Sequence, residues 1–218
     1  AYAFLIGGTA AHGVFSDATP FGNETVTAVL SCDKEKAVQL LDEAGYVDVN
    51  GDGIRENKDG SEMTLVFMVK GSFGSSDAGI LATAMQSDFK EVGINMELQS
   101  MESTGHSEPD TYWDFYTIQN NTASTGDPQS FLKSLYASDS AIGYHSEEID
   151  SIIAELDTTF DTQERYALAA KATQHLNENA ADLYLTNGYL ITVSSAKVEN
   201  AIQPVCDYYF LNKDITVK

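Results

Sequence analysis

The stretch AVQLLDEAGYVDVNGDGIREN, residues 37–57, decides how the chain divides into elements. It begins with apolar residues at helical spacing, and Gly45 then stands where a left-handed helix cap belongs. An acidic turn follows, in which Asp48, Asn50 and Asp52 alternate ahead of a glycine. This alternation is the first half of a calcium-loop pattern. Two interpretations are open: a calcium site, or a structural turn between a helix and a strand.

The calcium interpretation assigns a ligand to each position of the loop. Its candidate ligands are Asp48, Asn50, Asp52, the carbonyl of Ile54, Glu56 and Asp59. The last position holds Asp59, a shorter carboxylate than the usual Glu, and a strand follows where a paired calcium unit needs a helix. In the alternative, these Asp, Asn and Gly residues build a tight turn through hydrogen bonds from side chain to backbone.

Around this stretch the pattern predicts a strand–helix–strand unit. Asp33 is a plausible N-cap for the helix over residues 34–44, and residues 63–69 form a short, apolar, β-rich run. A helix over residues 77–92 and a strand over residues 94–98 follow with short connections. Two strands joined in this way are expected to be parallel, with a right-handed crossover.

The remainder of the chain continues the alternation of strands and helices. We expect an irregular segment over residues 1–30, a strand over 113–118, helices over 129–136, from Ser146 and over 162–179, a β-like stretch over 183–194 broken by a turn at Asn187-Gly188, and final strands over 198–202 and 208–211. The fold class is therefore α/β, with a mixed β-sheet flanked by helices.

Composition narrows the range of partners. Twelve Lys plus Arg against thirty-three Asp plus Glu give a formal net charge of −21, which repels nucleic acid and anionic lipid. No stretch approaches the roughly 18 apolar residues of a membrane helix. The opening AYAFLIGG looks like the interior of a protein, so we expect a mature or truncated chain. Cys32 and Cys206 either form one disulfide or remain free thiols.

The sequence carries no recognisable catalytic constellation. It has no GxSxG, no Walker A glycine run and no GxGxxG after a strand. Its four histidines are not spaced as HxxxH or HExxH, so a transition-metal site would need ligands from distant segments. We therefore expect neither an enzyme nor a cofactor, apart from the calcium option.

The loop QNNTASTGDP, residues 119–128, is the better candidate for a functional site. It follows a predicted strand and precedes a helix, and ligands of α/β sheets sit at the carboxyl ends of strands. The candidate ligand-binding residues are Tyr116, Gln119, Asn120, Asn121, Thr122, Ser124 and Tyr144, with Trp113 nearby. The alternative is a plain surface loop capped by an Asp-Pro pair.

Several motifs together resemble family 5 of the extracellular solute-binding proteins, the oligopeptide, dipeptide and nickel receptors of ABC importers. The motifs are LLDEAGY followed by DVNGDGIREN, FKEVGINMEL, and WDFYTIQ followed by GDPQSFLKSLY. The later helices also match, with a D-ER step in DTQER, residues 161–165. The resemblance implies a lobe of the type II periplasmic-binding-protein fold. It also favours the turn interpretation of DVNGDGIREN, which is a recurring feature of the family.

Family members are about twice as long, so the resemblance implies a C-terminal half that carries half of a cleft. It implies one α/β lobe over residues 1–191, and a hinge and C-terminal segment over 192–218 that returns toward the other lobe. Peptide-binding members often hold the peptide amino group with an acidic residue where this chain has Ser124 or Thr125. Nickel-binding members carry a histidine where this chain has Ile118 or Gln119.

The expectation is thus a substrate-binding component of an ABC importer that captures oligopeptides or a similar small polar solute. A receptor for nickel or a metal chelate is the alternative within the family, and a calcium-stabilised structural module is the alternative of another class. The implied partners are the solute and a membrane permease. We expect a monomer with an extracytoplasmic location, either periplasmic or lipid-anchored at the cell surface.

Overall fold

The computed structural model describes residues 7–28, 30–70, 77–101, 112–140, 143–189, 191–201 and 212–218. The chain divides into two compact units, each described here by itself. In the described part of the chain, the first unit is Ser31–Gln119, and the second joins Gly7–Leu30 to Asn120–Lys218. The second unit is therefore discontinuous in sequence, with the first unit inserted into it.

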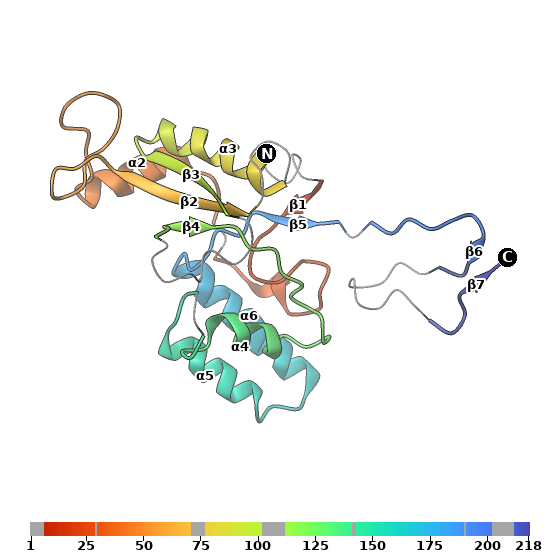
Figure 1. Ribbon diagram of the computed structural model, residues 1–218. Helices are drawn as coiled ribbons and strands as arrows, with labels where there is room; N and C mark the ends of the chain where they lie inside the picture. The colour runs from red at the N-terminus through yellow and green to blue at the C-terminus, as the bar shows by residue number, and fades with distance from the viewer. Residues whose placement is uncertain are drawn as a thin grey trace. The chain divides into compact units, whose positions relative to one another are not determined.

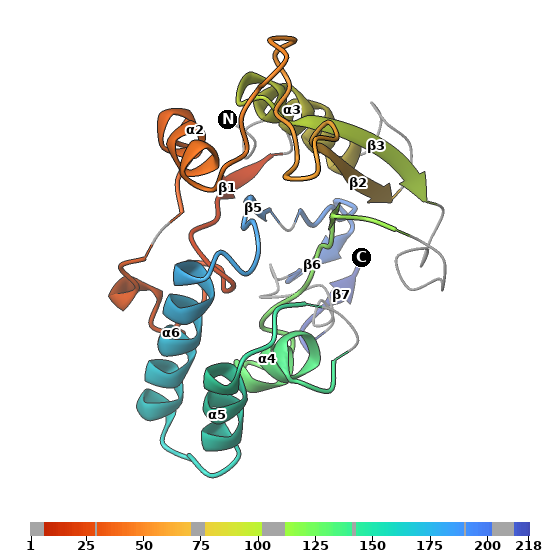
Figure 2. The same cartoon turned by 90° about the vertical axis from the view of Figure 1, so that its left-hand side faces the viewer.

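The first unit contains the predicted strand–helix–strand arrangement (Figure 1). Its elements are α2 (Lys34–Glu43), β2 (Thr64–Lys70), α3 (Asp77–Glu91), β3 (Asn95–Met101) and β4 (Phe115–Tyr116). The strands form a three-stranded sheet in the order β3-β2-β4, and β2 is parallel to both neighbours. The parallel pairing confirms the prediction, and α3 packs on β2 and β3 (Figure 2).

Helix α2 begins and ends where the sequence predicts. The side chain of Asp33 accepts a hydrogen bond from the Lys36 amide at 2.8 Å, and Gly45 has a φ of 87°, which favours glycine. However, α2 buries no residue, and Leu40 on its apolar face is 51% exposed. Instead, the Lys34 ammonium ties α2 to the side chains of two acidic residues of α3, at 2.7 and 2.6 Å.

The core of the first unit lies between the sheet and α3. Phe67 and Val69 of β2 are almost fully buried, as are Ala82 and Met85 of α3. Each fully buried large apolar side chain stabilises the fold by about 1.5–3 kcal/mol. The core of this unit therefore joins buried apolar side chains of β2 to those of α3.

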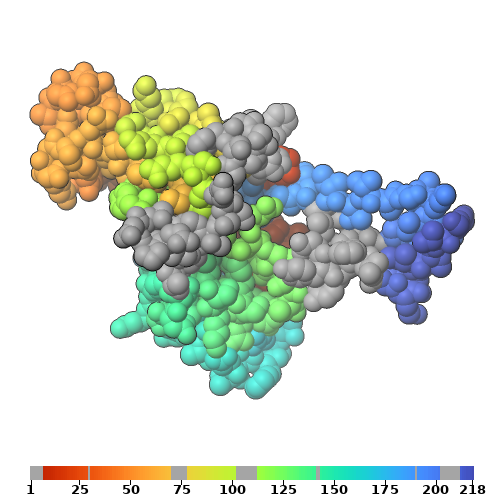
Figure 3. Space-filling model, viewed as in Figure 1, coloured from red at the N-terminus to blue at the C-terminus, as the bar shows by residue number. Residues whose placement is uncertain are grey.

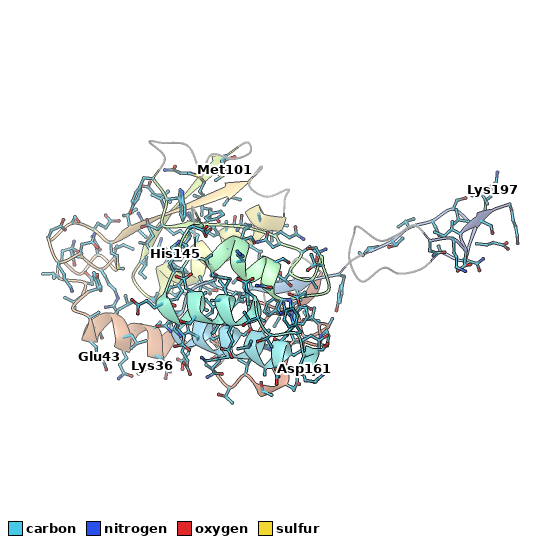
Figure 4. The ribbon with its side chains drawn as sticks, turned by 90° about the horizontal axis from the view of Figure 1, so that it is seen from below. Lys36, Glu43, Met101, His145, Asp161 and Lys197 are labelled. Atoms are coloured by element: carbon cyan, nitrogen blue, oxygen red, sulfur yellow. The ribbon has the colours of Figure 1, made fainter. Side chains whose placement is uncertain are left out.

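Helices dominate the second unit. Its elements are β1 (Gly8–Ala10), η1 (Asn23–Thr25), α4 (Gln129–Tyr136), α5 (Glu147–Leu156), α6 (Thr162–Glu178), β5 (Thr186–Gly188), β6 (Val198–Glu199) and β7 (Thr216–Val217). Helix α5 packs against both α4 and α6 (Figure 2). Ser146 caps α5 and Asp161 caps α6. Figure 4 labels Asp161 at the start of α6. The apolar stripe of α5 is buried and consists of Ile149, Ile152, Ile153 and Leu156.

Two predictions for the second unit are wrong. Asn187 and Gly188 do not form a turn, because they lie in β5, which pairs antiparallel with β1. Strand β1 belongs to a segment that the sequence predicted to be irregular. A Cβ at Gly8 would lie 2.5 Å from the carbonyl oxygen of Asn187, so the close pairing requires glycine there. From the same segment Phe15 and Phe21 enter the helical core.

The C-terminal part of the second unit is extended. Strand β6 confirms part of the predicted strand at residues 198–202 and pairs antiparallel with β7, which the sequence did not predict. The strand predicted at residues 208–211 lies outside the described residues, as does Cys206, so the cysteine pairing stays a prediction. The α/β prediction is confirmed, and within the described residues the antiparallel pairs β1-β5 and β6-β7 are separate from the parallel sheet.

Candidate functional site

The predicted ligand-binding residues divide between the two units. Tyr116 and Gln119 belong to the first unit. Tyr116 lies in β4, and its ring packs edge-on against the Trp113 ring, with 4.7 Å between the ring centroids. Gln119 is exposed. The other predicted residues, Asn120, Asn121, Thr122, Ser124 and Tyr144, belong to the second unit.

In the second unit, residues 120–127 form a loop that leads into α4, hereafter the 120–127 loop. The side chain of Asn121 accepts a hydrogen bond from the Ala123 amide at 3.2 Å, and the Gly126 amide donates to the Ala123 carbonyl at 3.0 Å. Thr122 and Ser124 are half-buried, and Asn120 is exposed. The loop is thus internally hydrogen-bonded and contains amide and hydroxyl side chains with no charge before its last residue.

Asp127, the last residue of the loop, is held by an arginine of α6. Arg165 donates from Nε and Nη2 to the two carboxylate oxygens of Asp127, at 2.7 and 2.8 Å. The Asp127 carboxylate also accepts the Gln129 amide at 2.9 Å, so it caps the start of α4. Its hydrogen bonds with Arg165 hold the pKa of Asp127 below its usual range.

Arg165 also contacts the end of α5 and the turn that follows. Its Nη1 donates to the carbonyl oxygens of Leu156 and Thr159, at 2.5 and 2.6 Å. Its Nη2 reaches the side chain of Gln129 at 3.1 Å, and Gln129 in turn donates to Asp157 at 2.5 Å. We call Asp127, Gln129, Asp157 and Arg165 the Arg165 cluster, which joins the 120–127 loop to α4, α5 and α6.

Sequence reasoning did not identify the role of Arg165. The GDP motif and the D-ER step were both recognised as family features, but nothing in their spacing indicates that Asp127 and Arg165 meet. A usable signal is present, because the chain contains only two arginines, Arg55 and Arg165. In a protein with a large excess of acidic residues, an arginine is a strong candidate for a structural ion pair, because its planar guanidinium can bind both oxygens of a carboxylate.

Tyr144 lies against the helical core rather than in the 120–127 loop. It is half-buried, and its hydroxyl lies 3.4 Å from Nε2 of His175 on α6. The same nitrogen lies 3.0 Å from the hydroxyl of Ser146, the N-cap of α5. These contacts explain the position of His175 in the fold, and they leave ligand binding by Tyr144 a prediction.

The candidate calcium residues form a tight turn with its own hydrogen bonds. The carboxylate of Asp48 accepts the amides of Gly51 and Gly53 at 2.7 and 2.9 Å, and Asp52 accepts the Ile54 amide at 2.8 Å. Asn50, Glu56 and Asp59 likewise accept backbone amides. This is the bonding that the turn interpretation predicts. Calcium binding stays a prediction.

The end of this turn is fixed by Arg55, whose side chain is 10% exposed. Its Nε donates to the Val92 carbonyl at 2.7 Å, and its Nη1 donates to Asp42 at 2.6 Å and also to the Tyr46 carbonyl. Arg55 therefore binds the carbonyls that follow α2 and α3. In the described ranges, no group of three or more His, Cys, Asp or Glu residues is placed to hold a metal ion.

A groove of about 420 Å³ lies on another face of the second unit, between α6 and residues 22–27. Two of its polar side chains are bonded within the protein: Gln174 accepts the Thr27 amide at 2.8 Å, and Lys171 pairs with Glu148 at 2.7 Å. None of the predicted ligand-binding residues lines this groove.

Solved structures share this fold. The oligopeptide-binding protein AppA of Bacillus subtilis, in complex with a nonapeptide, superposes with a TM-score of 0.70 and 21% identity, over 83% of this chain and 37% of AppA. A nickel ABC transporter protein of Bacillus halodurans gives a TM-score of 0.73 and 24% identity, over 95% of this chain and 43% of that protein. The fold is that of the type II periplasmic binding proteins.

The sequence places the chain within this class. Residues 2–142 match the family described as bacterial extracellular solute-binding proteins, family 5 Middle, and the chain belongs to this family. The nickel-binding protein NikA of Staphylococcus aureus is 24% identical over 131 residues, which is 58% of this chain and 27% of NikA. AppA is 36% identical over 84 residues, 38% of this chain and 15% of AppA.

The chain spans less than half the length of each of these proteins. Within the residues that the structure describes, no helix is both long enough and apolar enough to cross a membrane.

Proposed function

We propose that the protein is the substrate-binding component of an ABC importer and captures oligopeptides or a similar small polar solute. Membership of family 5 carries the proposal. The similarity to AppA, which is named an oligopeptide-binding protein, favours a peptide as the solute. The 120–127 loop suits an uncharged, polar part of such a ligand, because it offers amide and hydroxyl groups.

On this proposal the protein performs no chemistry. The similar proteins are named as binding proteins. The sequence has no GxSxG, Walker A or GxGxxG motif that would indicate an enzyme. The job of the protein is to enclose a solute and present the closed form to a membrane permease. A monomer located outside the cytoplasm, periplasmic or lipid-anchored, suits this task and the family.

A nickel or metal-chelate receptor is the second candidate. The similarity to NikA over 131 residues favours it. Against it, residues 112–128, which contain β4 and the 120–127 loop, include no histidine. We therefore rank a peptide or another polar solute ahead of nickel.

We further propose that residues 1–191 supply one lobe and that residues 192–218 form a hinge segment that returns toward another. Supporting this, Val193 is 89% exposed, and Ile191 just before the segment is 79% exposed. Figure 3 shows the blue surface of this segment standing clear of the helices of the same unit. Such apolar exposure suits a segment that packs elsewhere. A single lobe would hold half a cleft and bind solute weakly.

Thermal denaturation with a ligand panel tests the function. The 218-residue chain and a longer polypeptide containing it would be melted with peptides up to nonapeptides, with nickel, and with nickel plus histidine. A ligand at 100 times its Kd stabilises the folded state by about 2.7 kcal/mol, so binding raises the melting temperature. We expect peptides to do so in the longer polypeptide. No shift with any peptide would overturn the peptide proposal, and a shift with nickel and histidine alone would favour the second candidate.

A further inference from the structure

We infer that Arg165 is a positioning residue for solute binding: it fixes the 120–127 loop by binding Asp127 at the end of the loop. The inference rests on the proposed function, because this loop carries most of the proposed ligand contacts in the second unit. It goes beyond that function by naming the residue that sets the shape of the loop, although Arg165 lies 38 residues away in sequence.

The first reason is that both carboxylate oxygens of Asp127 are already hydrogen-bonded within the protein. Its Oδ2 accepts Arg165 Nε, and its Oδ1 accepts both Arg165 Nη2 and the Gln129 amide. A paired carboxylate of this kind is a fixed point of the backbone. It is also the only acidic residue of the loop, so the loop reaches the ligand with uncharged groups alone.

The second reason is that Arg165 is itself immobilised from the other side. The Leu156 and Thr159 carbonyls hold Nη1, and the side chain is 16% exposed. An arginine bound at all three nitrogens has one available orientation, and it transmits that orientation to Asp127. The position of the loop is thereby fixed relative to the C-terminal end of α5 and to α6.

The third reason is that the hydrogen bonds inside the loop are local. They include the Asn121 side chain on the Ala123 amide, the Gly126 amide on the Ala123 carbonyl, and the Thr125 hydroxyl, which donates to the Asp127 carbonyl at 3.2 Å and lies 3.1 Å from the Ser130 hydroxyl. Such short-range bonds open readily unless the ends of the loop are held. Loss of the Arg165 contact therefore loosens the loop before it unfolds the helices.

Lysine is not an adequate substitute at this position. Its single ammonium cannot bind both carboxylate oxygens and two backbone carbonyls in the geometry of a planar fork. Arg165→Lys therefore keeps the charge but loses the positioning, which separates the effect of geometry from that of charge.

Amide hydrogen exchange on the 218-residue chain, without ligand, tests the inference. In Arg165→Lys we expect the Ala123 and Gly126 amides to lose protection by roughly tenfold or more, while amides at the centre of α6 keep theirs. Arg55→Lys, which alters the arginine of the other unit, is the matched control and should leave the loop amides unchanged. Asp127→Asn is the second variant, used if Arg165→Lys does not fold, and it should loosen the same amides.

Two results overturn the inference. One is unchanged protection of the loop amides in the folded variant. The other is an equal loss across α4, α5 and α6, which would show that Arg165 only stabilises the unit as a whole. Because the exchange needs no ligand, either result is distinct from a failure of the peptide proposal in the melting experiment.

Discussion

Each unit of the protein contains one arginine, and the two side chains are bound in different ways. Arg55 donates mainly to backbone carbonyls that follow two helices, and its single carboxylate contact is to Asp42, whose side chain is 55% exposed. Arg165 also binds carbonyls, but two of its nitrogens donate to the carboxylate of Asp127. Both cations lie near helix C-termini, where the helix dipole favours positive charge.

The difference separates two uses of the same side chain. Arg55 joins the ends of α2 and α3, so its loss affects the first unit as a whole. Arg165 joins the 120–127 loop to α6 and to the end of α5, and on our inference its loss acts first on the loop. Four measurements can break or sharpen this comparison, in order of the size of the expected effect.

Arg55→Ala should produce the largest loss of stability. It leaves the Tyr46 and Val92 carbonyls without their donors and empties the space that a nearly buried side chain filled. Unsatisfied buried groups cost about 1–3 kcal/mol each, so we expect a loss of about 3 kcal/mol in urea denaturation. Lys36→Ala, at an exposed position of α2, should stay within about 0.5 kcal/mol of the wild type. Equal effects of the two substitutions would contradict the role of Arg55.

Gly93→Ala should produce the next largest loss, because it acts on the same arginine. Gly93 has a φ of 84°, and a Cβ there would lie 2.9 Å from Cγ of Arg55. Gly45 has a φ of 87° but has open space around it, so Gly45→Ala is the matched control for backbone strain alone. We expect losses of about 2 kcal/mol for Gly93→Ala and about 1 kcal/mol for Gly45→Ala. Equal losses would mean that the contact with Arg55 is readily relieved.

Asp127→Asn should lower stability by about 1 kcal/mol at neutral pH, since the pair is partly exposed to solvent. Because Arg165 lowers the folded pKa of Asp127, the native state binds fewer protons than the unfolded chain between the two pKa values. The contribution is therefore full above about pH 4, the unfolded value, and is lost as the pH falls through the folded pKa. The difference between variant and wild type should shrink on acidification, and a constant difference down to pH 2 would refute the ion pair.

Calcium removal should have the smallest effect. The oxygens of Asp48 and Asp52 already accept backbone amides, so a chelator should leave the melting temperature unchanged within error. Asp52→Ala should still lose about 1 kcal/mol, as the turn loses a hydrogen bond. If a chelator instead lowers the melting temperature, and Asp52→Ala abolishes that effect, the loop is a calcium site.

The sequence predicted the local elements of the fold well. The caps at Asp33 and Ser146 and the apolar stripe of α5 act within one or two turns, so their pattern is visible in a short window. The parallel pairing of β2 with β3 followed from the short connections around α3.

The features that the sequence missed depend on residues far apart in the chain. Asn187-Gly188 is a turn signal locally, but pairing with β1 overrides it. The contact between Asp127 and Arg165 joins two motifs that were recognised separately. The candidate ligand-binding residues were predicted from their position after a strand, and they stay a prediction.

The pairing of β1 with β5 has a consequence for the order of folding. Gly8 of β1 pairs with Gly188 of β5, so this pairing must await synthesis of all the residues between them. The β2–α3–β3 unit, by contrast, closes a short loop and can form while the ribosome is still translating the second unit. Phe15 and Phe21 precede the β2–α3–β3 unit in the sequence, yet they can be buried only after the helices of the second unit have been synthesised.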